Sequence, residues 1–184
     1  MGIAPTSKSY GFKITEKLAF FTDKDVEVVS LQKEKRRLLK LLINQNVKLI
    51  ESKIADYCSV DHCITLNSGT DALMVGMWAL GIKPGDEVIT PPNSFIASTA
   101  AIVHLGAKPI FADVGSNQLI DVNNIEKLIT KKTKAIMPVH LTGLMANMHT
   151  INSLAKKYNL FVIEDAAQSI GSKLNSRFSG TFGD

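Results

Sequence analysis

The sequence predicts an α/β fold in which a mostly parallel sheet is covered by helices on both faces. Short apolar segments alternate with longer segments whose apolar residues recur at three- and four-residue spacing. The short segments are apolar on both faces, as expected of strands buried between two helical layers. The chain has 184 residues, of which 45% are hydrophobic, so it is long enough for one domain with a substantial core.

The first predicted elements are helical. The pattern from Asp23 to Asn44 is strongly charged, as expected of a surface or interface helix. Asn46 is expected to cap a second helix. The apolar stripe of that helix consists of Val47, Ile50, Ile54 and Tyr57. We therefore predict an N-terminal segment over residues 1–45 and a main domain over residues 46–184.

The main domain alternates strands with helices. The predicted strands are His62–Leu66, Glu87–Thr90, Pro109–Asp113, Lys134–His140 and Leu160–Ile163. The predicted helices are Asp71–Leu80, Ser94 to about Leu105, Val122–Ile129 and Asn147–Tyr158. Asn93 or Ser94 is the expected cap of the second of these helices, and Asp121 of the third. Trp78 is expected in the core with the other large apolar residues of its helix.

The composition limits the classes of function. The net charge of +4 is mild, and the basic runs Lys33–Arg37 and Lys131–Lys132 are interpreted as solvated surface rather than a nucleic-acid interface. Cys58 and Cys63 fit neither a zinc pattern nor a disulfide framework. No apolar run is long enough to cross a bilayer. We expect a soluble cytoplasmic protein with no metal site and no nucleic-acid or membrane partner.

Two polar residues follow the last predicted strand. Ligands of open α/β sheets bind just outside the carboxyl ends of the strands. A carboxylate placed there, that of Asp165, can meet a cationic ring nitrogen, and the amide of Gln168 can meet a second polar atom of the same ligand. The alternative is that Asp165 only caps a following helix.

A candidate phosphate site lies between the first predicted strand of the domain and the helix after it. Gly69 allows an unusual backbone angle and close approach of a ligand. The amides of Gly69, Thr70 and Asp71 are expected to be free at the helix N-terminus, and the hydroxyls of Ser68 and Thr70 add donors. The alternative is an ordinary capped helix, because the glycine spacing matches neither a dinucleotide fingerprint nor a P-loop.

Phe95 and His140 also follow predicted strands. Phe95 is a candidate to stack on a planar ligand, and its alternative role is that of a core phenylalanine. His140 is a candidate substrate-side contact, and its alternative role is to hold the following loop. Together the four strand ends fit a phosphorylated heterocycle with a basic ring nitrogen. Pyridoxal 5'-phosphate is such a molecule, and a buried aspartate keeps its ring nitrogen protonated.

With these motifs the sequence resembles the DegT/DnrJ/StrS sugar aminotransferases, which are pyridoxal-phosphate enzymes of the aspartate aminotransferase fold (fold-type I). The resemblance runs from about Asn46 to Asp184. The segments that carry it are Asn67–Leu73, Gly81–Thr90, Pro92–Ala97, Gly106–Pro109, Pro138–Gly143, Glu164–Gln168 and Gly180–Asp184.

The resemblance implies roles for the candidate residues. Gly69 and Thr70 would hold the cofactor phosphate, Phe95 would stack on the pyridine ring, and His140 would lie near the substrate. Asp165 would pair with the pyridine nitrogen. Gln168 would hydrogen-bond the ring hydroxyl. Such enzymes transfer an amino group, usually from glutamate, to a keto sugar on a nucleotide, and they act as homodimers with the active site at the interface.

One family feature is not found in the sequence. The family's Schiff-base lysine lies in a Ser-Phe-x-x-x-Lys segment soon after the motif matched by Gly183 and Asp184, and this sequence ends at Asp184. Lys173 matches no family lysine position. We therefore expect the cofactor-binding part of a sugar aminotransferase, inactive alone. The alternatives are a lysine-less pseudoenzyme, half of a split enzyme, a sugar dehydratase of the same family, and a nucleotide-binding or regulatory domain without pyridoxal chemistry.

Overall fold

The computed structural model describes residues 44–184, and the chain divides into two compact units, residues 1–53 and 54–184. The expected charged helix from Asp23 lies outside the described residues except for its last position. A helix covers residues 44–58. Asn46, the expected cap, lies inside this helix, since residues 44 and 45 are already helical. That prediction was wrong.

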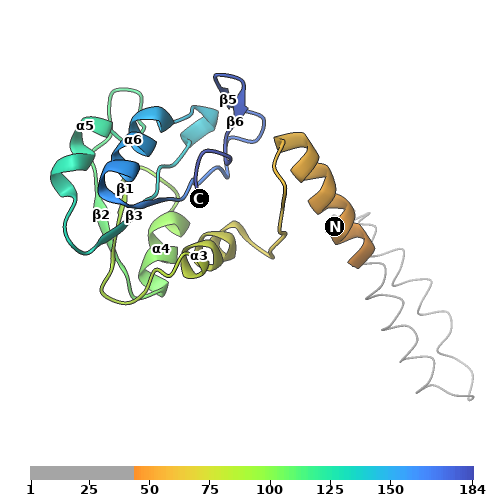
Figure 1. Cartoon of the computed structure of the whole chain (residues 1–184), viewed down its shortest axis with the longest axis horizontal. Helices are drawn as coiled ribbons and strands as arrows, with labels where there is room; N and C mark the ends of the chain where they lie inside the picture. The colour runs from red at the N-terminus through yellow and green to blue at the C-terminus, as the bar shows by residue number, and fades with distance from the viewer. Residues whose placement is uncertain (1–43) are drawn as a thin grey trace, which may run out of the picture. The chain divides into compact units, whose positions relative to one another are not determined.

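A four-stranded parallel sheet forms the centre of the second unit (Figure 1). Its strands are β1 (Glu87–Thr90), β2 (Lys108–Phe111), β3 (Thr133–Ile136) and β4 (Phe161–Val162). Their order is β2-β1-β3-β4, and every pairing is parallel. The carboxyl ends of all four strands therefore meet at one edge of the sheet.

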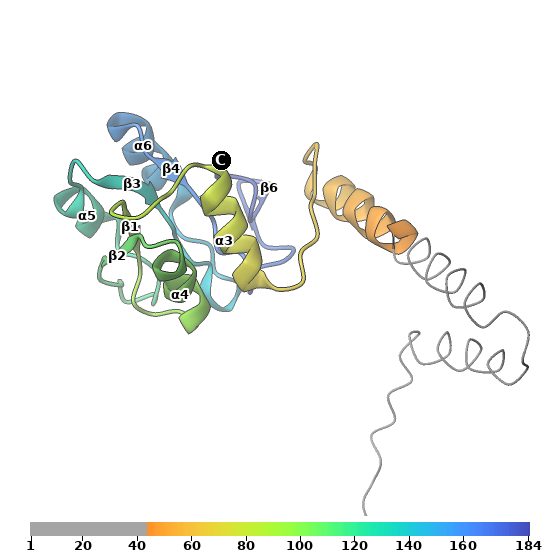
Figure 2. The same cartoon turned by 90° about the horizontal axis from the view of Figure 1, so that it is seen from below.

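Helices cover both faces of this sheet (Figures 1 and 2). On one face lie α3 (Gly69–Ala79) and α4 (Ile96–His104). On the other lie α5 (Val122–Ile125), the 3-10 helix η1 (Glu126–Leu128) and α6 (Met148–Tyr158). The fold class predicted from the sequence is confirmed.

The alternation of side chains along the strands explains the two helical layers. Val88 and Ala135 belong to the core cluster that contains Met77 of α3 and Ile102 of α4. The residues after them, Ile89 and Ile136, belong to the cluster that contains Ile125 of α5 and Ile151 of α6. Successive strand residues point to opposite faces, so β1 and β3 each supply both cores.

Side-chain caps begin three of the helices. Ser68 accepts a hydrogen bond from the amide of Asp71, Asp121 from that of Asn123, and Asn147 from that of Thr150. The cap expected at α4 was wrong. The N-cap residue is Phe95, which makes no side-chain cap. Asn93 donates instead to Gln118, and the Ser94 hydroxyl contacts the Ser98 hydroxyl.

Two further predictions were wrong. The expected strand His62–Leu66 is not a strand, and Ile64 is 79% exposed. Trp78 is 69% exposed, since α3 buries Met77 and adjacent residues of a helix point about 100° apart.

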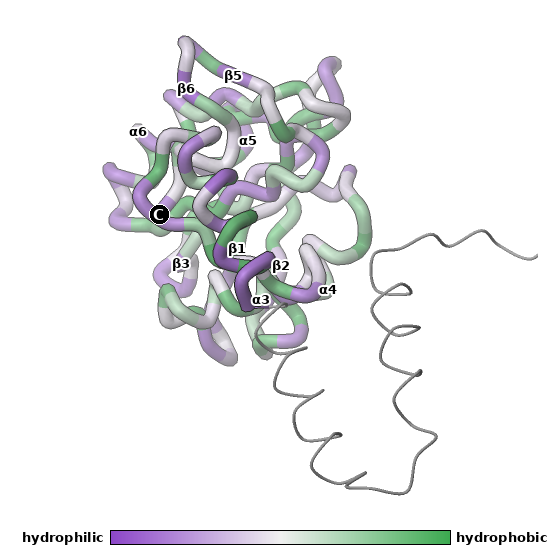
Figure 3. The backbone as a smooth tube through the Cα atoms, turned by 90° about the vertical axis from the view of Figure 1, so that its right-hand side faces the viewer, coloured by the Kyte–Doolittle hydropathy of each residue, from purple (hydrophilic) through white to green (hydrophobic). Residues whose placement is uncertain are grey.

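The chain after β4 adds a small hairpin of β5 (Lys173–Leu174) and β6 (Arg177–Phe178). Asp165 is followed by a turn, not by a helix. No helix within residues 44–184 is long and apolar enough to cross a membrane. Figure 3 shows hydrophobic stretches that are short and interrupted by hydrophilic residues along the backbone.

Candidate cofactor site

A cavity of about 180 Å³ lies where the segments after β1, β3 and β4 meet the first turn of α3. Its lining includes five of the residues that the sequence marked as cofactor contacts. These are Gly69, Thr70, Phe95, Asp165 and Gln168. The parallel sheet thus gathers at one edge groups that are up to 99 positions apart in the chain, from Gly69 to Gln168.

Asp165 is fixed through both its backbone and its side chain. Its backbone forms an isolated parallel bridge with Val139, and its amide donates to the carbonyl of Pro138 at 2.9 Å. Its carboxylate accepts a hydrogen bond from the Ser98 hydroxyl at 2.6 Å and one from the amide of Ala167 at 3.3 Å. Only 8% of the residue is exposed. Asp165 therefore does not cap a helix but presents a held carboxylate to the cavity.

The side chain of Gln168 is held by the segment after β3. Its Oε1 atom accepts a hydrogen bond from the amide of Thr142 at 2.8 Å. Thr142 has a left-handed backbone, with φ of 54°. Because the amide oxygen is engaged, the NH₂ group is the part of Gln168 that remains to donate to a ligand.

The N-terminus of α3 differs in detail from the prediction. The hydroxyl of Ser68 donates to Asp71 Oδ2 at 2.9 Å and accepts from the Asp71 amide at 3.1 Å. That amide is thus not free, and Ser68 and Asp71 satisfy each other rather than lining the cavity. Gly69 is helical and not left-handed, and a Cβ added there would meet no atom within 4 Å. Gly69 and Thr70 are the members of the motif that face the cavity.

Phe95 borders the cavity and is 71% exposed. The alternative role of a core phenylalanine is therefore wrong. Phe95 is held at the start of α4, where the Ser98 amide donates to its carbonyl at 3.2 Å. The exposed ring is available to stack on a planar ligand.

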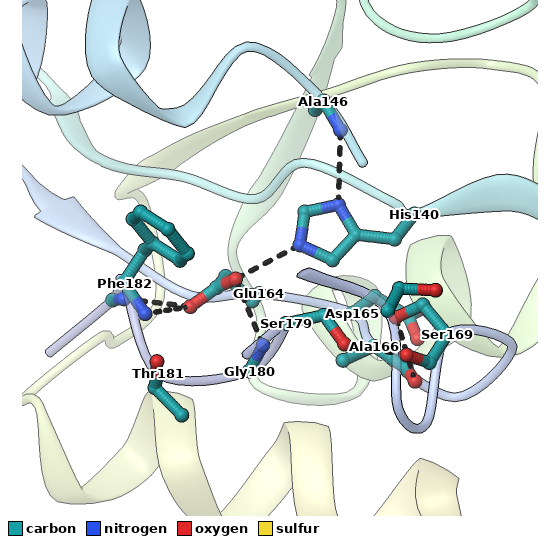
Figure 4. A network of polar contacts seen from close by, with 12 residues as sticks. His140, Ala146, Glu164, Asp165, Ala166, Ser169, Ser179, Gly180, Thr181 and Phe182 are labelled. Carbon is teal, nitrogen blue, oxygen red and sulfur yellow. Dashed lines mark hydrogen bonds and ion pairs between the residues drawn. The ribbon is translucent and has the colours of Figure 1, made fainter. Parts of the chain in front are cut away.

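His140 does not line the cavity among the described residues, and it is fully buried. Its Nδ1 atom accepts from the amide of Ala146 at 3.2 Å, and its Nε2 atom lies 2.8 Å from Glu164 Oε2 (Figure 4). Because Nδ1 accepts this hydrogen bond, it carries no hydrogen itself, and Nε2 carries the ring hydrogen. The structure supports the second of the two predicted roles, in which His140 holds the following loop.

Glu164 precedes Asp165, and the sequence predicted no role of its own for it. Its carboxylate accepts hydrogen bonds from three backbone amides and from His140 (Figure 4). The three amides are those of Gly180, Phe182 and Gly183. Burial alone would raise the pKa of Glu164, but the hydrogen bonds from His140 and these amides outweigh burial and lower the pKa. Glu164 ties the end of β4 to the segment 180–183.

The arrangement can bind a ligand of defined chemistry. An anionic carboxylate lies at one part of the cavity wall, and the positive end of the α3 dipole lies at another. An exposed aromatic ring and an amide donor lie beside them. Such a set complements a flat, cationic ring that carries an anionic group.

Comparisons with known proteins show the family of this chain. Residues 32–184 match the DegT/DnrJ/EryC1/StrS aminotransferase family. The chain is 42% identical over 158 residues to the pleiotropic regulatory protein of Geobacillus stearothermophilus. This match covers 85% of this chain and 42% of that protein. It is 47% identical over 145 residues to UDP-N-acetyl-3-dehydro-alpha-D-glucosamine 3-aminotransferase of Acidithiobacillus ferrooxidans. This second match covers 78% of this chain and 39% of that enzyme.

A solved structure with bound cofactor is also similar. NtdA from Bacillus subtilis with bound PMP superposes with a TM-score of 0.70 at 42% identity, over 72% of this chain and 31% of that one. The chain thus spans about two fifths of the length of the two relatives named above. The family match covers most of the chain and includes the whole cavity wall. The chain belongs to the DegT/DnrJ/EryC1/StrS aminotransferase family.

Proposed function

We propose that this chain is the pyridoxal-phosphate-binding part of an aminotransferase that acts on a nucleotide-linked keto sugar, with glutamate as the amino donor. The observation that carries the proposal is the position of Asp165. Its carboxylate is held by Ser98 and Ala167 and lines a cavity that also contains Gln168, Phe95 and the first turn of α3.

The donor set fits this cofactor. Asp165 would accept a hydrogen bond from the protonated ring nitrogen, and the free NH₂ group of Gln168 would donate to the ring hydroxyl. The amides of Gly69 and Thr70, at the positive end of α3, would bind the phosphate. Phe95 would cover one face of the ring. Ser68 and Asp71 would act indirectly, because their mutual hydrogen bonds fix the turn that presents those amides.

The bound cofactor would supply a ring that accepts electrons from a carbanion. The chain's own residues prepare that ring. Asp165 would hold a proton on the ring nitrogen, because an anionic carboxylate stabilises a nearby cation. Gln168 and the α3 amides would orient the ring, and Phe95 would exclude water from one face of it.

The substrate class rests on the relatives. The enzyme from Acidithiobacillus ferrooxidans is named for a UDP-linked dehydro sugar. We therefore propose a nucleotide sugar as the substrate of the aminotransferase whose cofactor-binding part this chain forms. We also propose a homodimer with the active site at its interface. Phe95, Ile96 and Trp78 are 71%, 67% and 69% exposed, and such apolar side chains are suited to an interface. A cytoplasmic location agrees with the reduced state of Cys58 and Cys63.

Catalysis needs an amine at the cavity, and no lysine is among the residues that line it within the described range. We propose that residues 1–184 alone hold the cofactor but do not turn over substrate. The lysine-less binding protein, the split enzyme and the dehydratase are alternatives that share this cofactor site, so cofactor binding is the step to test first.

The test is a titration of the chain with pyridoxamine phosphate, in which the fluorescence of the ligand reports binding. We expect saturable binding that Asp165→Ala weakens at least tenfold, since a charge-assisted hydrogen bond is lost. The matched control is Asp61→Ala, which removes an exposed carboxylate outside the cavity lining. Equal binding by both variants would contradict the site. Borohydride treatment with pyridoxal phosphate should label no lysine specifically, and specific labelling with turnover would refute the inactivity of the chain.

A further inference from the structure

Ser98 connects α4 to the carboxylate of Asp165. It lies in the first turn of α4, three residues after Phe95, and only 1% of it is exposed. Its hydroxyl donates to Asp165 Oδ2 at 2.6 Å, although the two residues are 67 positions apart. A second hydroxyl, that of Ser94, lies 2.7 Å from the Ser98 hydroxyl.

The direction of these hydrogen bonds follows from the proton count. An ionised carboxylate can only accept, and a serine hydroxyl has one proton to donate. The Ser98 hydroxyl therefore donates its hydrogen bond to Asp165, and the Ser94 hydroxyl must be the donor in the contact with Ser98. The result is two consecutive hydrogen bonds with one direction, from Ser94 to Ser98 and from Ser98 to Asp165.

These two hydrogen bonds fix one carboxylate oxygen of Asp165 and also lower the basicity of the carboxylate. The backbone of Asp165 is fixed independently, by the hydrogen bond from its amide to the Pro138 carbonyl and by that from the His140 amide to its own carbonyl. Ala167 holds the other carboxylate oxygen. A hydroxyl that donates to a carboxylate draws charge from it and makes it a weaker acceptor for a further proton. A second hydroxyl behind the first strengthens this effect.

We propose that Ser98, supported by Ser94, is a positioning residue that sets how strongly Asp165 holds the proton on the ring nitrogen of the bound cofactor. The inference rests on the proposed function, since it concerns the same cavity. Ser98 and Phe95 share the first turn of α4 and its N-cap. One rigid element thus covers the ring and adjusts the group that faces its nitrogen.

The experiment uses pyridoxamine phosphate labelled with ¹⁵N in the ring. The ¹⁵N chemical shift of the bound ligand reports the protonation of that nitrogen, and it is followed across pH in the wild-type chain and in variants. Ser98→Ala should raise the pH at which the ring nitrogen loses its proton by about one unit, because the carboxylate regains the charge that the hydroxyl withdrew. Ser94→Ala should raise it by less, and Ser98→Thr, which keeps the hydroxyl, should restore the wild-type value.

The outcomes separate this inference from the proposed function. If the wild-type chain does not bind the labelled ligand, the proposed cofactor site fails and this inference fails with it. If the wild type binds and Ser98→Ala leaves the ¹⁵N profile unchanged or shifts it to lower pH, only this inference is overturned, and Ser98 is a structural residue. If Ser98→Ala does not fold, Ser94→Ala decides, and an unchanged profile in that variant overturns the inference.

Discussion

The Nε2 atom of His140 donates to Oε2 of Glu164 across 2.8 Å, and both side chains are almost fully buried. The two residues follow β3 and β4, which are neighbours in the sheet. The other nitrogen of His140 accepts from Ala146, and the other contacts of Glu164 are amides of the segment 180–183. The pair therefore joins two strand ends to a loop and to the last residues of the chain.

Replacing Glu164 by Gln should lower the free energy of unfolding by about 3 kcal/mol at neutral pH. The glutamine is uncharged, and its NH₂ group would face the amide donors of Gly180, Phe182 or Gly183. Denaturant unfolding followed by circular dichroism measures the change. The matched control is Glu126→Gln, because Glu126 is exposed and pairs with Lys157 at the surface; its effect should be much smaller. Similar losses for the two variants would contradict the role given to Glu164.

The contribution of Glu164 should depend on pH with a definite sign. The pKa of Glu164 is lowered from its ordinary value of 4.5 in the folded chain, so the unfolded chain binds more protons there. Its stabilisation is present above that ordinary value and is lost as the pH falls through the lower folded value. The difference in unfolding free energy between wild type and Glu164→Gln should therefore shrink as the pH falls below about 4.5. A difference that stays constant down to pH 3 would exclude this linkage.

Gly183 should tolerate no side chain. A Cβ added there would lie 2.5 Å from the carbonyl oxygen of Val162, which is backbone of β4 and cannot move aside easily. Gly183→Ala should destabilise the chain by about 1–3 kcal/mol. Gly76→Ala is the control, since Gly76 lies inside α3 with no atom within 4 Å of an added Cβ. That change should stabilise by about 0.5–1 kcal/mol. Thermal unfolding of the two variants in parallel checks the opposite signs, and destabilisation by both would count against the Val162 clash.

Phe95→Ala should weaken binding of pyridoxamine phosphate by about threefold to tenfold while leaving stability nearly unchanged. The ring is 71% exposed, so its loss removes little from the core. Val103→Ala, at the other end of α4, removes a 55% exposed apolar side chain and should leave binding unchanged. Ligand titration and thermal unfolding of the same samples separate the effects. Unfolding of the Phe95 variant before ligand addition would show that the ring is structural.

Much of the fold and part of the site followed from the sequence. Asp165 and Gln168 were recognisable because they directly follow an apolar strand, and strand ends in a parallel sheet meet at one edge. Glu164 and Ser98 were not recognised, because their contacts depend on how distant segments pack. The partners of Glu164 lie 16 to 24 positions away, and Asp165 lies 67 positions from Ser98. The segment His62–Leu66 has the composition of a strand, but it does not form one, because composition alone does not decide secondary structure. Trp78 was misplaced, because it follows the buried Met77 by one residue and so points away from the core.

The central claim is that Asp165 pairs with a ring nitrogen, and a thermodynamic cycle tests it most directly. The affinities of pyridoxamine phosphate and of an analogue with carbon in place of the ring nitrogen are measured for the wild-type chain and for Asp165→Asn. We predict that the wild type prefers the nitrogen-containing ligand at least tenfold, because the charge-assisted hydrogen bond is worth more than about 1.4 kcal/mol, and that the preference disappears in Asp165→Asn. The same preference in both proteins, or none in the wild type, would contradict the claim.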